Sequence, residues 1–246
     1  MLNRDARHHA LLQVGVAGQQ RIAAGSVLVI GAGGIGCAIA NYLAASGVGR
    51  LVISDFDTVD ASNLGRQVLF RPADVGAPKA RLVADRLGEQ NPDIEISAVT
   101  ARLQGDALLD AVAASDLVLD GSDNFATRFA VNDACVARQR RLISGSAIRL
   151  EGQLAVFGPD YTRTPCYRCL YSEADESLDS CAGNGVLSAV PGVVGTLMAV
   201  EALKSLAGLD CATGSLQLYD ASASEFRRLD IQKREGCPAC ANAEKP

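Results

Sequence analysis

Val27-Leu-Val-Ile-Gly-Ala-Gly-Gly-Ile-Gly36 decides the fold, because this stretch joins a short apolar run to four glycines. An apolar run that ends in glycine is typical of a buried strand in a parallel sheet. Gly31, Gly33 and Gly36 allow a tight turn and let backbone N–H groups approach a phosphate at the start of a following helix. A helical pattern then continues through Leu43. The stretch therefore predicts a strand, a phosphate-binding loop and a helix.

An acidic residue ends the next apolar run, Arg50-Leu-Val-Ile-Ser-Asp55. Asp55 comes at the end of the second predicted strand, where an acid can hold the hydroxyl groups of a ribose. The glycine loop and this acid together predict an adenosine-containing nucleotide. They do not separate NAD from ATP.

Strand and helix patterns alternate as far as position 145, after a helical lead-in at 10–24. The further strands are expected at 94–99, 116–120 and 141–144, and the helices at 79–90 (with Pro78 as first residue), 106–114 and 125–138. This alternation predicts an α/β fold with a Rossmann-like, mostly parallel central sheet flanked by helices. Beyond it, we expect a strand at 153–157, a helix at 193–206 and an antiparallel strand pair at 216–219 and 225–231. We predict a single domain, 1–246, with a nucleotide-binding part (1–150) and a C-terminal part (151–246).

Composition excludes several classes of protein. The 246 residues carry 23 Lys and Arg against 28 Asp and Glu, so the net charge is −5 and no basic footprint for nucleic acid or an anionic membrane exists. The longest uncharged stretch, 180–200, contains Pro191 and four glycines, which is unlike a membrane span. The first residues contain no apolar segment of a signal peptide. We expect a cytoplasmic protein.

Charged residues beside the predicted loop favour ATP over NAD. The two histidines, His8 and His9, lie near the N-terminus, and no Tyr-x-x-x-Lys occurs, so the usual proton donors of a dehydrogenase are missing. Arg66 and Lys79 can neutralise a triphosphate, and Asp123 can hold Mg²⁺. Each also has a simpler interpretation. The two cations could be solvated surface charges, and Asp123 could cap the following helix.

Two cysteine pairs of equal spacing, Cys166-Tyr-Arg-Cys169 and Cys237-Pro-Ala-Cys240, lie far apart in the sequence. Among eight cysteines in a chain expected in the cytoplasm, such pairs point to metal or catalysis rather than disulfides. Two pairs suit a closed, structural, tetrahedral zinc site that fastens the C-terminal segment to the region after the sheet. A redox-active pair or an empty site is the alternative.

Seven short strings carry a resemblance to a known family and occur in that family's order: Gly31-Ala-Gly-Gly-Ile-Gly36, Ser54-Asp-Phe-Asp-Thr-Val59, Ser62-Asn-Leu-Gly-Arg-Gln67, Pro78-Lys79, Asp120-Gly-Ser-Asp-Asn124 and the two cysteine pairs. By these motifs the chain resembles the ThiF/MoeB/HesA adenylyltransferases, bacterial relatives of the ubiquitin-activating enzymes. The match runs from about Arg4 to Cys240.

The resemblance implies a reaction. Enzymes of this family bind Mg·ATP and a small β-grasp sulfur-carrier protein, ThiS- or MoaD-like, that ends in Gly-Gly. The carrier's C-terminal carboxylate attacks the α-phosphorus, pyrophosphate leaves, and an acyl adenylate forms for later attack by sulfur. The resemblance thus implies a nucleotidyltransferase of thiamin or molybdopterin biosynthesis that works as a homodimer. Because no rhodanese-like segment follows Cys240, we expect a separate sulfur donor, a cysteine desulfurase or rhodanese-like protein.

The resemblance also assigns roles to residues. Nucleotide binding is implied for Gly31, Gly33, Gly34, Gly36, Asp55, Asp57, Asn63, Arg66, Gln67, Lys79, Asp123 and Asn124. Arg66, Lys79 and Asp123 are the implied catalytic residues, and Asp123 also organises Mg²⁺. Arg7 would reach the triphosphate of the partner subunit. The zinc ligands are Cys166, Cys169, Cys237 and Cys240, so 151–246 becomes the zinc-bearing and carrier-binding part.

Some questions stay open at this point. Cys181 lies in an acidic segment. In the thiamin branch of the family, a cysteine at this place relays sulfur, whereas in the molybdopterin branch the corresponding cysteine is not required for adenylation. Cys181 is therefore either a sulfur-relay residue or an incidental loop cysteine. Gly65 stands where the family commonly carries Gln, and no role is assigned to Cys211. Thiamin, molybdopterin, cysteine and thionucleotide pathways all fit. A nucleotide-binding scaffold that kept the fold and an NAD-dependent dehydrogenase are the other candidate functions.

Overall fold

The computed structural model describes residues 4–172, 185–241 and 243 and is built around one eight-stranded sheet in this part of the chain, ordered β3-β2-β1-β4-β5-β6-β7-β8. The strands are β1 (Ser26–Ile30), β2 (Arg50–Ser54), β3 (Glu95–Val99), β4 (Leu117–Asp120), β5 (Arg141–Ile148), β6 (Glu151–Phe157), β7 (Ser215–Asp220) and β8 (Glu225–Asp230). Strands β1 to β5 pair in parallel, and β6, β7 and β8 extend the sheet in antiparallel fashion. The predicted mostly parallel sheet with antiparallel C-terminal strands is confirmed.

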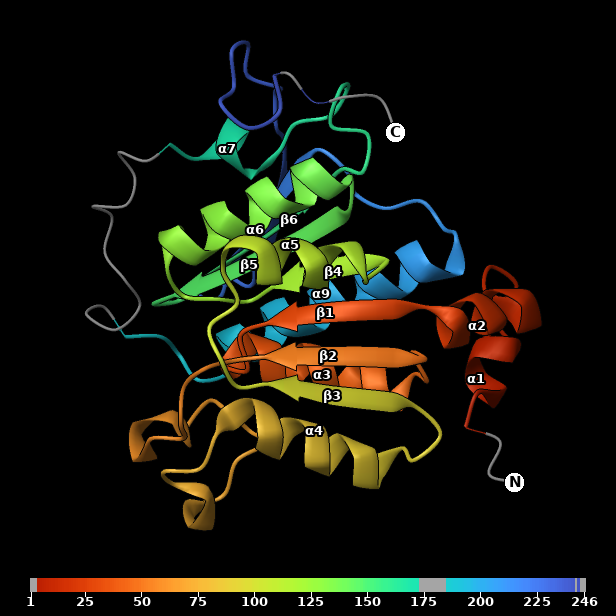
Figure 1. Ribbon diagram of the computed structural model, residues 1–246, viewed down its shortest axis with the longest axis vertical. Coiled ribbons are helices and arrows are strands. Elements are labelled where there is room, and N and C mark those ends of the chain that lie inside the picture. The colour runs from red at the N-terminus through yellow and green to blue at the C-terminus, as the bar shows by residue number, and fades with distance from the viewer. Residues whose placement is uncertain (1–3, 173–184, 242, 244–246) are drawn as a thin grey trace.

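Helices cover both faces of the sheet (Figure 1). They are α1 (Ala6–His9), α2 (Gly15–Ala24), α3 (Gly34–Ala45), α4 (Lys79–Gln90), α5 (Gly105–Ala113), α6 (Phe125–Arg138), α7 (Tyr167–Leu170) and α9 (Val190–Ala207). Side chains of a strand alternate between faces, so Val27 and Val29 belong to the core under α3, α4 and α9, whereas Leu28 and Ile30 belong to the core under α5 and α6. The two cores fix the parallel strands from both sides.

The boundaries of α2, α4, β5 and α9 differ from those that the sequence predicts. The predicted helix at 10–24 begins at Gly15, which has φ +57°, and a separate short helix α1 precedes it. Pro78 is the N-cap of α4 rather than its first residue. β5 continues to Ile148 because it pairs with β6, and α9 begins at Val190 with Pro191 in its first turn.

The helix α9 is long and apolar enough to cross a membrane by length and composition, and it is the one such helix in the described part of the chain. Half of it is buried in the fold, where it packs against α3, β5 and β6. A Cβ at Gly195 would lie 2.3 Å from the Ile35 carbonyl oxygen, so the α3 and α9 backbones touch at this glycine. In this structure α9 is a core helix.

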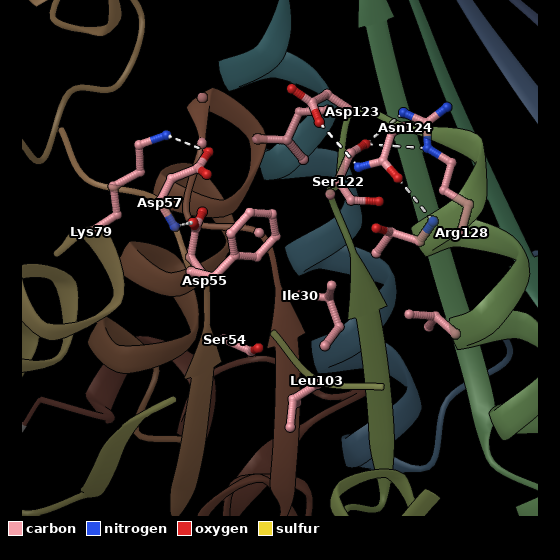
Figure 2. A pocket seen from close by; sticks show the side chains of 18 of the residues that line it. Ile30, Ser54, Asp55, Asp57, Lys79, Leu103, Ser122, Asp123, Asn124 and Arg128 are labelled. Atoms are coloured by element: carbon pink, nitrogen blue, oxygen red, sulfur yellow. Dashed lines mark hydrogen bonds and ion pairs between the residues drawn. The ribbon is translucent and has the colours of Figure 1, made fainter. Parts of the chain in front are cut away.

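The strand order reverses direction at β1 and β4, and this reversal positions the site. The chain proceeds outward from β1 to β2 and β3 on one side, and from β4 to β5 on the other. In open parallel sheets, a crevice forms beyond the carboxyl ends of the strands at such a switch point, and ligands bind there. The glycine loop after β1, the acidic loop after β2 and the loop after β4 all lie at this edge (Figures 1 and 2).

Candidate active site

A cavity of about 320 Å³ lies at the carboxyl ends of β1, β2 and β4, within the range of small-ligand sites. Its walls come from the glycine loop, the segments after β2 and β4, the first turns of α4 and α6, and residues 102–104. Figure 2 shows the carboxylates after β2 with Lys79 on one side and the loop after β4 on the other. Segments far apart in sequence therefore share one concave site.

The glycine loop is shaped by two close backbone contacts. Gly31 has φ +87°, and a Cβ there would lie 3.2 Å from the Gly121 backbone. A Cβ at Gly36 would lie 1.8 Å from the Gly31 carbonyl oxygen, so α3 starts directly against β1. At Gly33 the nearest atom to a Cβ would be the Gln67 amide nitrogen at 3.7 Å. The first N–H groups of α3 thus open onto the cavity, where they can bind phosphate oxygens.

Two backbone N–H groups orient the Asp55 carboxylate. Its Oδ2 accepts a hydrogen bond from Ala32 at 2.7 Å, and its Oδ1 accepts one from Asp57 at 2.8 Å. Burial raises the pKa of Asp55, while these N–H groups and the Lys79 ammonium oppose the shift. The carboxylate lies at the margin of the glycine loop, where an acceptor for ribose hydroxyl groups is needed.

A buried cation lies beside this acid. The Lys79 ammonium is 3.2 Å from Asp57 Oδ2, and the side chains of Lys79 and Asp57 are 8% and 55% exposed, respectively. A lysine is rarely buried unless it is paired, and here the carboxylate of its partner Asp57 is largely exposed to solvent. Lys79 also lines the cavity, so its charge can act on an anionic ligand there.

Arg66 and Gln67 complete the cationic side of the cavity. Arg66 is half-buried and donates from Nη1 to the Ser62 carbonyl oxygen at 3.0 Å, which fixes one end of its guanidinium. Gln67 is 4% exposed, and its Oε1 has no hydrogen-bond partner among the described residues. A buried amide oxygen without a partner is costly, and a ligand or water in the cavity would satisfy it.

Asp123 faces the cavity, and its neighbour caps the helix. The Asn124 Oδ1 accepts a hydrogen bond from the Thr127 N–H at 2.9 Å and caps α6, so the interpretation of Asp123 as this N-cap is wrong. Asp123 is exposed, lines the cavity, and has its Oδ1 3.4 Å from the Asn124 amide nitrogen. Its oxygens are the type of ligand that Mg²⁺ prefers.

These groups fit a magnesium–nucleotide complex by their chemistry. The cavity combines the first N–H groups of α3, the cations Arg66 and Lys79, the acceptor Asp55 and the carboxylate of Asp123. N–H groups and cations suit a polyphosphate, and the exposed carboxylate suits the metal ion that accompanies it. The Gln67 Oε1, which finds no hydrogen-bond partner in the described part of the chain, also indicates a polar ligand.

Other residues expected at the site lie elsewhere or outside the described residues. Asn63 is buried, accepts a hydrogen bond from the Asp60 N–H at 3.2 Å, and does not line the cavity. Arg7 is exposed on α1. His8 of α1 is hydrogen-bonded to Gln19, and Gln19 Nε2 donates to the carbonyl oxygen of Ser46, the C-cap of α3. This end of α3 is the end remote from the glycine loop. Cys181 lies outside the described residues.

Phe56, Arg102 and Arg128 line the cavity and were not predicted as site residues from the sequence. The Arg102 guanidinium carbon lies 3.9 Å from the centre of the Phe56 ring, and both residues line the cavity. Arg128 returns from α6 to the preceding loop, where its Nε and Nη2 donate to the Ser122 carbonyl oxygen at 3.2 and 2.5 Å. The available signal for Arg128 was its position one helical turn after Asn124. No sequence signal identified the contact between Arg102 and Phe56.

The four paired cysteines come together at α7, and their Sγ atoms lie within 4.8 Å of one another. The Sγ atoms of Cys166 and Cys237 are 3.7 Å apart, and those of Cys169 and Cys240 are 3.5 Å apart. Tetrahedral zinc with bonds of about 2.3 Å separates its sulfurs by about 3.8 Å, so the cluster fits zinc. Burial opposes ionisation of Cys237, but the Cys240 and Ala239 N–H groups lower its pKa to about 7.

The other three cysteines among the described residues, Cys37, Cys135 and Cys211, have ordinary packing roles. Cys37 and Cys135 are fully buried in the two cores, as expected for small core residues, and burial raises the pKa of Cys37 to about 12. Cys211 is half-buried after α9, with its Sγ 3.7 Å from the Glu201 carbonyl oxygen and 3.6 Å from that of Leu209.

Comparison with known proteins gives a family and a set of relatives. The model of the ThiF family matches residues 6–239. The chain is 44% identical over 240 residues to the Sulfur carrier protein ThiS adenylyltransferase of Escherichia coli (strain K12), covering 98% of this chain and 95% of that protein. It is 43% identical over 247 residues to the Sulfur carrier protein adenylyltransferase of Thermus thermophilus, covering 98% and 91%.

Two further similarities are more limited. The chain is 46% identical over 241 residues to the Adenylyltransferase and sulfurtransferase MOCS3 of Mus musculus, covering 96% of this chain and 52% of the mouse protein. The crystal structure of E. coli MccB with ATP superposes with a TM-score of 0.85 at 22% identity, covering 98% of this chain and 74% of that one. At that identity the structural likeness shows a shared fold and nothing more.

Proposed function

The chain belongs to the ThiF family, and from that premise we propose that it uses ATP to adenylate the C-terminal carboxylate of a small sulfur-carrier protein. The observation that carries the proposal is the single cavity in which the glycine loop, two cations and the Asp123 carboxylate converge. Nucleotidyl transfer needs positioning and charge neutralisation more than covalent participation by the protein, and these groups provide both.

Each group of the cavity has a defined task in this reaction. The N–H groups at the start of α3 bind the phosphates, and Asp55 accepts hydrogen bonds from the ribose hydroxyl groups. Lys79 and Arg66 neutralise charge that develops as the carrier carboxylate attacks the α-phosphorus and pyrophosphate leaves. Asp123 holds Mg²⁺, which supplies further neutralisation of the phosphates when bound. Asp57 holds the Lys79 ammonium at the cavity wall.

Several finer assignments are part of the proposal. The carrier is a β-grasp protein that ends in Gly-Gly and meets 151–246, the zinc-bearing part, while 1–150 binds the nucleotide. The chain acts in the cytoplasm as a homodimer, in which Arg7 reaches the triphosphate that is bound by the partner subunit. The Arg7 side chain is exposed and does not line the nucleotide cavity of its own subunit, which supports its role in the partner subunit. A separate cysteine desulfurase or rhodanese-like protein supplies sulfur, with Cys181 as a relay residue.

The decisive experiment is ATP–pyrophosphate exchange with Mg²⁺ and a panel of carriers that end in Gly-Gly. Exchange with one carrier, lost when its last glycine is removed, is the expected result and selects the pathway. ATP binding without exchange with any carrier would favour a nucleotide-binding scaffold, and reduction of a nicotinamide cofactor would favour a dehydrogenase.

Subunit mixing tests the role of Arg7. Each of the Arg7→Ala and Asp123→Ala chains should be inactive alone, because each lacks one component of every site. If Arg7 acts in the partner's site, a mixed dimer contains one intact site, and mixing should restore about a quarter of wild-type exchange activity for random pairing. Absence of any recovery in verified mixed dimers would exclude action of Arg7 in trans.

A further inference from the structure

A long loop beside α4 carries two of the cavity residues, Arg66 and Gln67 (Figure 1). The loop spans residues 60–75 between β2 and α4. Its neck is closed by the backbone of Val59, which forms hydrogen bonds of 2.8 and 2.9 Å with the backbone of residues 76 and 77. Loops of this length with little secondary structure are uncommon, and compact loops with close ends are frequently functional. The neck fixes the two ends, so other contacts fix the part of the loop that reaches the cavity.

The cavity end of the loop is a run of linked turns that contacts the glycine loop. The N–H groups of Arg66 and Gln67 both donate to the Asn63 carbonyl oxygen, at 3.0 and 2.9 Å, and the Phe70 N–H donates to the Gln67 carbonyl oxygen at 3.0 Å. The Arg66 carbonyl oxygen would lie 3.2 Å from a Cβ at Gly34. Because consecutive turns share these hydrogen bonds, a displacement of the backbone at Phe70 carries Arg66 and Gln67 with it.

Arg86 of α4 holds the returning part of the loop at two places. Its Nη2 lies 2.7 and 2.6 Å from the two carboxylate oxygens of Asp74, and its Nη1 donates to the Leu69 carbonyl oxygen. Asp74 in turn accepts a hydrogen bond from the Arg71 N–H. The side chains of Arg86 and Asp74 are 19% and 11% exposed. A guanidinium–carboxylate pair with so little exposure is directional, and solvent screens it less than a surface pair.

Phe70 and Arg86 fasten the loop in different ways. The Phe70 side chain is 7% exposed and belongs to the core under α3, α4 and α9. Burial of an apolar ring holds the loop against the core but has no preferred direction. The hydrogen bonds of the planar Arg86 guanidinium do have preferred directions, so they define the orientation of the loop on the core.

We propose that Arg86 is a positioning residue for adenylation, which holds the loop from α4 and thereby sets where the Arg66 guanidinium lies in the nucleotide cavity. The inference rests on the proposed function and adds to it a residue that does not line the cavity. In that function Arg66 neutralises charge that develops in the reaction, so its contribution depends on its placement. ATP itself is bound mainly by groups outside the loop, namely the glycine loop, Asp55 and Lys79.

The substitution Arg86→Met removes the guanidinium and keeps an unbranched side chain at the same position. The loop keeps its neck and the buried Phe70 ring but loses its directional contacts, so Arg66 is less often in its productive place. A displacement of about 1 Å costs about 100-fold in rate, and a partial loss of placement should cost about 10-fold. We therefore expect kcat for ATP–pyrophosphate exchange to fall about 10-fold, while the KM for ATP changes less than about 3-fold.

Arg81→Met is the matched control. Arg81 lies on the same helix, and its side chain is exposed, without a hydrogen-bond or ion-pair partner in the described part of the chain. Both substitutions remove one positive charge from α4 and introduce the same side chain. Both variants are assayed well below their thermal unfolding transitions, so that lost stability does not lower the measured rate. We expect wild-type kcat and KM in Arg81→Met, and equal kcat in the two variants would overturn the proposal.

A double-mutant cycle with Arg66→Ala tests whether Arg86 acts through Arg66. When the Arg66 guanidinium is absent, Arg86→Met should lower kcat by less than about 2-fold further. Independent, multiplicative losses would overturn the proposal.

Asp74→Asn breaks the same ion pair from the loop side with a smaller change in shape, and it supplies the test if Arg86→Met does not fold. The amide cannot accept the paired hydrogen bonds of a carboxylate, so kcat should fall about 3-fold or more while the KM for ATP changes less than about 2-fold. A wild-type kcat in Asp74→Asn would also overturn the proposal.

A spectroscopic measurement separates this inference from the proposed function. In amide NMR spectra of the free protein, Arg86→Met should shift the Arg66 and Gln67 signals, whereas Arg81→Met should leave them in place, whether or not a carrier is known. Wild-type protein that is inactive with every carrier would refute the proposed function alone. Unchanged Arg66 and Gln67 signals in Arg86→Met would refute the positioning role alone.

Discussion

Gly36→Ala is the substitution for which the structure gives the clearest magnitude. A Cβ at this position would lie 1.8 Å from the Gly31 carbonyl oxygen and 2.8 Å from its carbonyl carbon. Both atoms belong to backbone, so no side chain can rotate away. Even a 3.0 Å separation therefore requires the glycine loop and α3 to move apart as backbone segments. That movement also disturbs the Ala32 N–H that binds Asp55.

The expected loss of stability follows from these contacts. Overpacking in a dense core costs about 1–3 kcal/mol, and weakening a hydrogen bond to a carboxylate costs a further 1.5–3 kcal/mol or so. Alanine stabilises a helix interior by about 1 kcal/mol relative to glycine, which offsets part of this loss. The net loss is about 1.5–5 kcal/mol, which lowers the urea midpoint by roughly 0.5–1.7 M if the denaturant slope is about 3 kcal/mol/M.

Gly88→Ala is the control, because Gly88 lies within α4 and a Cβ there would meet nothing within 4 Å. This variant should gain about 0.5–1 kcal/mol from helix propensity alone. Urea unfolding at one fixed protein concentration measures both variants, and calorimetric titration measures ATP affinity, which should fall at least about 10-fold in Gly36→Ala only. Wild-type stability together with normal ATP affinity in Gly36→Ala would refute the reasoning.

Four further predictions address the site and the cysteine cluster. Asp123→Ala should abolish adenylate formation with unchanged thermal unfolding, and normal turnover in exchange assays would remove Asp123 from the site. Gly65→Ala should be tolerated and gain up to about 1 kcal/mol in urea unfolding, because Gly65 has ordinary φ and a Cβ there would lie 4.0 Å from its nearest neighbour; destabilisation would contradict this. Burial raises the pKa of Asp55, so the folded chain keeps that proton to a higher pH than the unfolded chain does, and the unfolding free energy should decline as pH rises from 3.8 through the folded pKa. In urea unfolding measured at a series of pH values, Asp55→Asn should reduce the decline of the unfolding free energy with pH. An unchanged decline in this variant would contradict the assignment of the effect to Asp55. Cys237→Ser should lose bound zinc in elemental analysis and lower the melting temperature, whereas retained stoichiometric zinc would show that the cluster does not bind it as proposed.

Local sequence patterns determined the elements that need no distant partner. The apolar run at 27–30 with its glycines specifies the strand, the loop and the start of α3, because spacing, glycine content and helix periodicity are all read within one short stretch of chain. The two cysteine pairs likewise indicate a metal cluster, since each pair presents two thiols from one short turn. The sequence also indicated that antiparallel strands follow the parallel ones.

Tertiary packing decided which polar groups meet and which remain apart. Asn124, and not Asp123, caps α6, because the path of the loop after β4 is set by the hydrogen bonds of Ser122 with Asp120 and Arg128. Arg102 reaches Phe56 only because residues that follow β3 and β2 meet at one edge of the sheet.

The backbone N–H of Tyr167 similarly reaches Asn132 of α6 from a distant part of the sequence, and the two atoms that form this hydrogen bond are 2.8 Å apart. A periodic pattern records which face of an element is buried. The pattern does not specify which side chain of another element packs on that face. This pairing is fixed when the helices pack on both faces of the sheet and form the two hydrophobic cores.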